Sequence, residues 1–358
     1  MIQFGSSLRQ PKQQTMKQTV FPAPTGGMDA RTAVAAGDLN ICIWAVNIMP
    51  TEYGMRVRNG YRVWQETLPS AVRTIIPYDG LVDTGADDRI FAVCAEGIYD
   101  VTSQAGTPVQ MIAFANVGES SGWGTYLHYS KQNGDDIIYY ADSANGLFIY
   151  DGGVWAQATG ITGAADISVD PPDLTKVVYI VSHKLRLWFI EKDKNYAWYL
   201  PINAFQGEAT PFFFGGKFKH GGDLVGLYNW TQDGGQGRDD FLVAVGRGGD
   251  VMPYRGDDPS SAMTWENVGI FFIGRVPIGH NCASEYGGNL YLLSRLGVIT
   301  MGELVAGAEV LDPARSQMGS KIAPLIRQDM VDYGDEYGWN IKFAAEQGQL
   351  VINTPLLS

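Results

Sequence analysis

Carboxylates gather in one glycine-rich stretch of the 358-residue sequence, TQDGGQGRDD, which covers residues 231–240. Carboxylates at this density are typical of calcium-binding loops and of sites that bind or hydrolyse sugars. A calcium loop of the helix–loop–helix type needs oxygen ligands at alternate positions after its first aspartate. Here Gly235 and Gly237 follow Asp233 at those positions, so the calcium pattern fails.

A sialidase-type aspartate box, S/T-x-D-x-G-x-x-W, is matched only in part. Thr231, Asp233 and Gly235 fit the pattern, but Arg238 stands where the aromatic residue belongs. The plainer interpretation, a connection between two strands of a hairpin, therefore carries more weight. We keep three carboxylates of this stretch as candidate partner contacts: Asp233, Asp239 and Asp240.

No other combination of residues supports catalysis. The sequence has no G-x-S-x-G elbow and no phosphate-binding P-loop, and its four histidines form no metal-binding pair. Adjacent carboxylates at 239–240 and 257–258 point apart on a strand or loop, which argues against a general acid and base pair. We assign no catalytic residue, metal ligand or cofactor, and expect that the chain is not an enzyme.

The formal net charge of −12 is unevenly distributed. Residues 1–70 carry seven Lys and Arg against four Asp and Glu, a net charge of +3, which leaves −15 for the remainder. The acidic body argues against tight DNA binding, yet it permits DNA to pass without adhering. The basic bias supplies six further candidate partner contacts, for which a solvated surface is the alternative: Arg9, Lys12, Lys17, Arg56, Arg58 and Arg62.

Composition also limits the cellular setting. No apolar run reaches the ~18 residues that a membrane span needs, and MIQFGSSLRQ has no apolar signal core. The three cysteines, Cys42, Cys94 and Cys282, lie in separate apolar runs and are expected to be reduced core residues. Only 18% of the residues are charged, so we expect other subunits to cover part of the surface.

Short apolar runs that each meet a turn recur along the chain and predict β-hairpins. Their first strands begin near Ile90, Ile137, Leu185, Phe241 and Leu290, at intervals of 47, 48, 56 and 49 residues. One four-stranded propeller blade takes roughly 40–50 residues. The predicted fold class is therefore all-β, a β-propeller-like platform of repeated antiparallel hairpins or blades with a few short helices. A strand-like run near Leu350 is expected to open a sixth unit.

Three regions are expected from these patterns. Residues 1–24 form an extended N-terminal arm, which either docks on a partner or is a disordered terminus without consequence. Residues 25–73 form an entry segment that packs on the propeller. Residues 74–358 form the propeller-like body, which is expected to be incomplete at its C-terminal end.

Within the entry segment, Asp38 is expected to cap a short helix that runs to about Val46. Met55, Val57 and Tyr61 then predict a strand that carries the three arginines on its other side, with a turn at 59–60.

Near the C-terminus, Ser320 is expected to cap a helix over residues 321–331, and a strand pair follows in WNIKFAAE and QLVINTP. The expected apolar face of this helix consists of Ile322, Leu325, Ile326 and Met330.

Read as whole phrases, the sequence resembles the tail nozzle proteins of short-tailed bacteriophages, also described as tail tubular proteins of the second kind or packaged-DNA stabilisation proteins. The phrases follow one another in order over most of residues 22–355. They are PAPTGGMDAR, LNICIWAVNIMPTEYGMRVRNGYR, HKLRLWFIEKDKNYAWYLPINAFQGEAT, GGDLVGLYNWTQDGGQGRDDFLVAVGRGGDVMPYRGDDP through GRVPIGH, and SKIAPLIRQDM.

The resemblance implies a structural virion protein of the phage tail that is assembled in the host cytoplasm. It implies a homohexameric ring below the tail adaptor protein, with tail fibre or needle proteins as further partners. Double-stranded DNA would pass through the lumen without specific binding. Members of the family generally continue for further strands beyond TPLLS, so the last β unit is expected to be incomplete, with an open sheet edge.

Two other functions fit the hairpin pattern. One is a carbohydrate-binding or glycosidase β-propeller, which only the partial aspartate box supports. The other is a cellular propeller that acts as an interaction scaffold, which explains the hairpins but not the order of the phrases.

Overall fold

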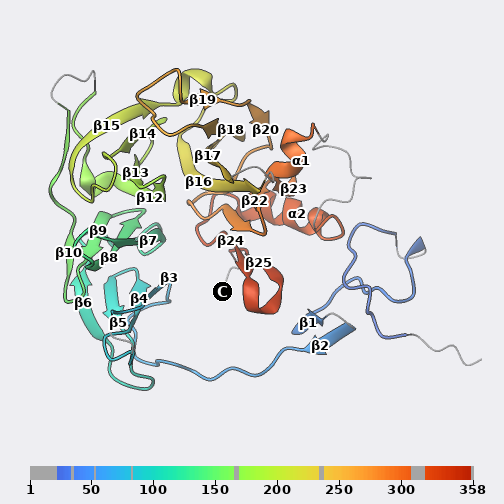
Figure 1. Cartoon of the computed structure of the whole chain (residues 1–358). Coiled ribbons are helices and arrows are strands. Elements are labelled where there is room, and N and C mark those ends of the chain that lie inside the picture. Colours follow the sequence, from blue (N-terminus) through green and yellow to red (C-terminus); the bar gives the residue numbers. More distant parts are fainter. Residues whose placement is uncertain are drawn as a thin grey trace, which may run out of the picture. The chain divides into compact units, whose positions relative to one another are not determined.

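The structure is a computed structural model that describes residues 22–33, 36–51, 54–81, 84–164, 169–233, 238–307 and 319–355. The chain forms two compact units, Met1–Gly60 and Tyr61–Ser358 (Figure 1). The expected arm lies outside the described residues up to position 21.

The first unit contains one small antiparallel sheet. Strand β1 (Ile48–Thr51) pairs with β2 (Gly54–Val57), and the pairing ends where Ile48 faces Val57. The strand predicted to continue through Tyr61 is therefore too long. One more backbone hydrogen bond, from the Arg58 N–H to the carbonyl oxygen of Asn47 at 2.7 Å, follows the last pair, and Asn47 has a φ of 57°, which is not an extended conformation. Of the three arginines, only Arg56 lies on the strand.

The helix predicted from Asp38 to about Val46 is wrong. The described residues of this segment form turns and bends, and Cys42 forms an isolated parallel bridge with Met28. A short helix is stabilised mainly by the burial of an apolar face. No such face is buried, since the large apolar side chains are exposed at Leu39, Ile43, Trp44 and Val46.

The second unit begins with two four-stranded antiparallel sheets. The first has the order β3 (Thr74–Tyr78), β4 (Arg89–Cys94), β5 (Gly97–Asp100) and β6 (Val109–Ala113). The second consists of β7 (Gly124–Ser130), β8 (Asp136–Asp142), β9 (Gly146–Tyr150) and β10 (Trp155–Gln157), also in chain order. Each is a meander of neighbouring hairpins, the strand order of a propeller blade.

The third and fourth sheets follow the same order and gain a strand at the edge. The third contains β12 (Val177–His183), β13 (Arg186–Glu191), β14 (Tyr196–Tyr199) and β15 (Gly207–Phe213), with β11 (Ile161–Gly163) parallel to β15. The fourth contains β16 (Leu224–Asp233), β17 (Arg238–Gly246), β18 (Asp250–Arg255) and β19 (Glu266–Asn267), and β20 (Phe271–Phe272) also pairs with β18. Three-residue 3-10 turns lie before β12 and after β15, at Leu174–Lys176 and Gly215–Lys217.

The last two sheets are smaller. The fifth has the order β21 (Ala283–Tyr286), β22 (Asn289–Ser294) and β23 (Gly297–Thr300), and the sixth pairs β24 (Asn340–Ala344) with β25 (Gln349–Asn353). Helices α1 (Met301–Val305) and α2 (Ala323–Tyr333) lie between them in sequence, and a 3-10 turn, Ala345–Gln347, joins β24 to β25. Leu350 thus lies in the second strand of the sixth sheet, which opens with β24.

Alternating burial explains why the central strands have continuous apolar runs. In β8, Ile138 and Tyr140 pack with the first sheet, whereas Ile137 and Tyr139 pack with the third. β13 repeats this arrangement between the second and fourth sheets. A sheet that is buried on both faces needs apolar residues at every position, and each such side chain contributes about 1.5–3 kcal/mol through burial.

The first strands of neighbouring sheets contact one another, β7 with β12, β12 with β16, β16 with β21 and β21 with β24. Sheets that face each other in succession, with their first strands adjacent, form a β-propeller-like platform (Figure 1). The predicted fold class is confirmed. The runs near Ile90, Ile137, Leu185, Phe241 and Leu290, which were predicted to begin the successive hairpins, form β4, β8, β13, β17 and β22. One further strand precedes each of them in its meander.

The predicted C-terminal helix is present as α2, but its cap is different. Ile322 occupies the N-cap position without a side-chain hydrogen bond, so the predicted capping role of Ser320 is wrong. Pro324 in the first turn fixes the start of the helix, because it lacks the N–H that a cap would satisfy. The helix buries Ala323, Ile326 and Met330.

Candidate functional site

The six basic contact candidates are not brought together by the described structure. Arg9, Lys12 and Lys17 lie outside the described residues. Arg56 and Arg58 belong to the first unit and Arg62 to the second, and all three are exposed. They stay predictions as partner contacts.

The three acidic candidates lie where β16 and β17 meet. Asp233 pairs in register with Arg238, Gln232 with Asp239, and Thr231 with Asp240. The Thr231 hydroxyl donates to a carboxylate oxygen of Asp240 at 2.8 Å, and this hydrogen bond links the two strands. The stretch is thus a hairpin, as its plainer interpretation predicts, and its tip at 234–237 lies outside the described residues.

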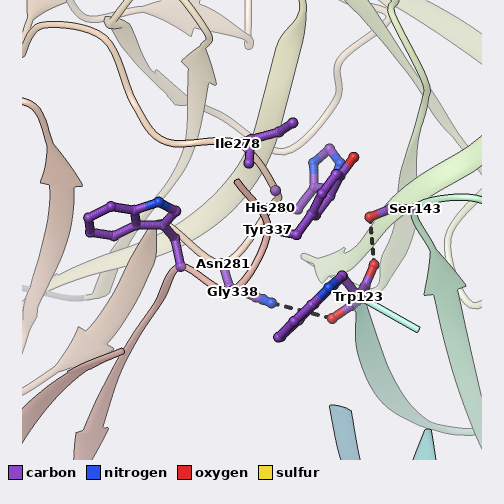
Figure 2. Close-up of a pocket in the computed structure, with 10 residues that line it drawn as sticks. Trp123, Ser143, Ile278, His280, Asn281, Tyr337 and Gly338 are labelled. Carbon is purple, nitrogen blue, oxygen red and sulfur yellow. Dashed lines mark hydrogen bonds between the residues drawn. The ribbon is translucent and has the colours of Figure 1, made fainter. Parts of the chain in front are cut away.

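A small pocket lies where the second sheet meets two later segments of the second unit; we call it the axial pocket. It is lined by the start of β7, the β8–β9 turn, residues 278–281 and residues 337–339 (Figure 2). The Asn281 amide donates to the carbonyl oxygen of Gly124 at 3.3 Å across this junction. Its cavity volume of about 10 Å³ has room for about one water molecule.

Asp142 holds the β8–β9 side of the axial pocket. Its carboxylate is fully buried and accepts N–H groups from Gly122, Ala144 and Asn145 at 2.6–3.0 Å. Loss of hydration raises the pKa of this carboxyl despite these hydrogen bonds. The network fixes the turn so that the Ser143 hydroxyl donates to the carbonyl oxygen of Trp123 at 2.5 Å.

Residues 337–339 supply the opposite side. Gly338 has a φ of 127°, which favours glycine, and a side chain there would meet Trp123 and Pro355. Figure 2 shows Tyr337 and His280 among the residues that line the pocket. An aromatic–glycine–aromatic triplet, Tyr337-Gly338-Trp339, was the sequence signal that could have revealed this site, but its partners lie too far away in sequence to be inferred.

Burial keeps the His280 and Tyr337 side chains of the axial pocket neutral near pH 7. Desolvation lowers the pKa of His280 to about 4, and its Nδ1 lies 2.5 Å from the carbonyl oxygen of Val225. Desolvation also raises the pKa of the Tyr337 hydroxyl. Neutral groups around a space for one water do not form a site for an ion or a sugar ring.

The other histidines form structural contacts. His183 is buried and its Nδ1 lies 2.8 Å from the Asn229 side-chain oxygen, while desolvation lowers its pKa. His220 bonds the buried Asp250 at 2.8 Å, and His128 is exposed. No group of three metal-ligating side chains occurs among the residues that the structure describes. The cysteines there are unpaired; Cys94 and Cys282 are buried, as expected, and Cys42 is half-buried.

Charged contacts between neighbouring sheets were missed in the sequence. Lys184 in the β12–β13 turn pairs with Asp257 after β18 at 2.7 Å, and Arg186 lies 3.7 Å from Asp258. Exposed pairs of this kind contribute at most about 1 kcal/mol each. They join the third sheet to the fourth, and nothing in the local sequence signals a contact across 73 residues.

Comparisons with known proteins show likeness of backbone only. The sequence matches no family model, and it matches no curated protein. Similar solved structures include BBS1N in complex with ARL6DN, with a TM-score of 0.40 and 12% identity over 68% of this chain and 69% of that chain. A nidogen/laminin complex has a TM-score of 0.36 and 15% identity over 63% and 75% of the two chains. YCF48 from Cyanidioschyzon merolae has a TM-score of 0.30 and 11% identity over 57% of this chain and 58% of that chain. Similarities at this level carry no argument about function.

Proposed function

We propose that this chain is a structural virion protein that forms the homohexameric nozzle at the end of a short phage tail. It extends the channel through which DNA is retained and ejected, and it has no enzymatic activity. The observation that carries the proposal is the ordered set of nozzle-like phrases over most of residues 22–355. The tail adaptor protein above, and fibre or needle proteins, are its proposed partners.

The described body is compatible with such a mechanical role. Its central strands are buried on both faces, which suits a stiff wall. Among the described residues, neither helix is long and apolar enough to cross a membrane.

Imaging of the purified full chain tests the proposal. Negative-stain electron microscopy is expected to reveal six-fold rings with a central channel, and native mass spectrometry to give six copies. The same rings should join purified tails that lack this protein. A chain that stays monomeric at high concentration and never joins such tails would contradict the nozzle.

A further inference from the structure

Three arginines gather on one small area of the otherwise acidic second unit. Arg275 follows the fourth sheet, Arg295 lies in the β22–β23 turn and Arg327 lies on α2, which contacts β23. The backbone N–H of Arg295 donates to the carbonyl oxygen of Arg275 at 2.9 Å. We call these three residues the arginine cluster.

The arginine cluster is less neutralised than other arginines of this unit. Four of those others lie within 4 Å of a carboxylate oxygen: Arg89, Arg186, Arg247 and Arg255. Within the described part of the chain, the Arg295 guanidinium is exposed and has no hydrogen-bond or ion-pair partner. Arg327 donates only to a backbone oxygen, that of Leu296, at 3.3 Å.

Among the described residues, one exposed carboxylate is the only acid bonded to the cluster. Arg275 Nη2 lies 2.5 Å from Asp335, whose side chain is 73% exposed. An ion pair this exposed is weak, because water and salt screen both partners. Asp335 therefore holds Arg275 in place but competes poorly with an incoming anion.

A recess between Arg275 and Arg295 gives an anion a place to bind. Its volume is about 110 Å³, and Asp335 and the end of α2 form its other side. Val276 and Met330 at the recess are buried apolar residues.

We propose that the arginine cluster is a binding site for a phosphate group. Guanidinium groups present planar forks of N–H donors that match phosphate oxygens, and most donors of this cluster are unused within the described structure. The phosphate comes either from a small phosphate ester or from the backbone of DNA. The site belongs to a single chain and does not depend on the proposed ring.

Titration calorimetry of the full chain with inorganic phosphate at low ionic strength tests the site. Arg295→Ala should weaken binding about tenfold or more, since a hydrogen bond to a charged group is lost. Asp335→Asn should tighten binding several-fold, because it removes a carboxylate that lines the recess and repels an anion. Arg255→Ala, which removes an exposed arginine of the fourth sheet, is the matched control and should leave binding unchanged.

A second arm identifies the source of the phosphate. Short duplex DNA that binds with the same dependence on Arg295 assigns the site to the nucleic-acid backbone, whereas binding of phosphate alone assigns it to a small ester. Circular dichroism checks that each variant is folded. If Arg295→Ala does not fold, Asp335→Asn still tests the site, because it keeps all three arginines. The proposal is overturned if the wild-type chain binds no phosphate, if neither variant changes the affinity, or if acetate competes equally well.

Discussion

Burial of His280 makes the folded state sensitive to acid. In the unfolded chain its pKa is about 6.5, whereas desolvation lowers it to about 4 in the fold. The unfolded state therefore binds a proton first as the pH falls, so the free energy of unfolding should decrease between about pH 6.5 and pH 4. The interval between the two pKa values corresponds to roughly 3 kcal/mol.

Urea denaturation of the wild type and of His280→Asn at a series of pH values measures this effect. Asparagine keeps an N–H donor for the Val225 carbonyl but does not titrate, so the variant should lose less stability below pH 6.5. His183, whose pKa is also lowered, is present in both proteins and cancels in the difference. Parallel pH profiles for the two proteins would show that His280 is not the responsible group.

At the residue scale, sequence patterns were poor at identifying which side chains are buried. His280 stands between Gly279 and Asn281, with no local sign that it is buried. It is enclosed because Tyr228, on a strand fifty-two residues earlier, donates to its carbonyl oxygen at 2.7 Å. Contacts at such separations follow from how the sheets stack, which no short motif encodes.

At the element scale, the β12–β13 turn has side chains that disfavour its conformation. Lys184 and Leu185 have φ values of 46° and 61°, as a two-residue hairpin turn between His183 and Arg186 requires. A residue with a Cβ in the left-handed conformation destabilises the fold by about 1–2 kcal/mol. Glycine removes this strain, but the greater entropy of the unfolded chain that contains it offsets about 0.5–1 kcal/mol of the gain. Leu185→Gly should therefore raise the free energy of unfolding by roughly 0.5–1 kcal/mol.

Val154→Gly is the matched control for this prediction. Val154 is 61% exposed and Leu185 is 62% exposed, but only Leu185 has a positive φ. The Val154 variant should lose stability, because glycine adds entropy to the unfolded chain without relieving strain. Chemical denaturation compares the two, and equal losses in both variants would argue against strain in the turn.

The central hairpins were predictable because their runs are apolar at every position and end in clear turns. The outer strands were not, since β10, β19 and β20 have only two or three residues each. Helix α1 was missed although Thr300 and Glu303 form a capping box, because Met301 continues the apolar run of β23. The helix wrongly predicted after Asp38 is the opposite case: the capping residue is present in the sequence, but the segment has no apolar face that the fold buries.

At the scale of the whole molecule, a spacing of about fifty residues was enough to predict successive sheets around an axis. It could not reveal the axial pocket, because Trp123 and Tyr337, which both line it, lie far apart in the sequence. Nor could it reveal the arginine cluster, whose members lie up to 52 residues apart in sequence. Both features arise from closure of the sheets on one another.

Charge gives the last prediction, which concerns assembly. Residues 71–358 carry a net charge of −15, so copies of the acidic body repel one another when they approach. The screening length falls from about 30 Å at 0.01 M salt to about 8 Å at 0.15 M salt. The proposed ring should therefore form more completely as sodium chloride rises over this range, which sedimentation velocity measures. If basic residues of the first unit, such as Arg56, instead bind the acidic body of a neighbouring copy, added salt would dissociate the ring. The sign of the salt effect thus decides whether repulsion between bodies or attraction through the basic segment dominates assembly.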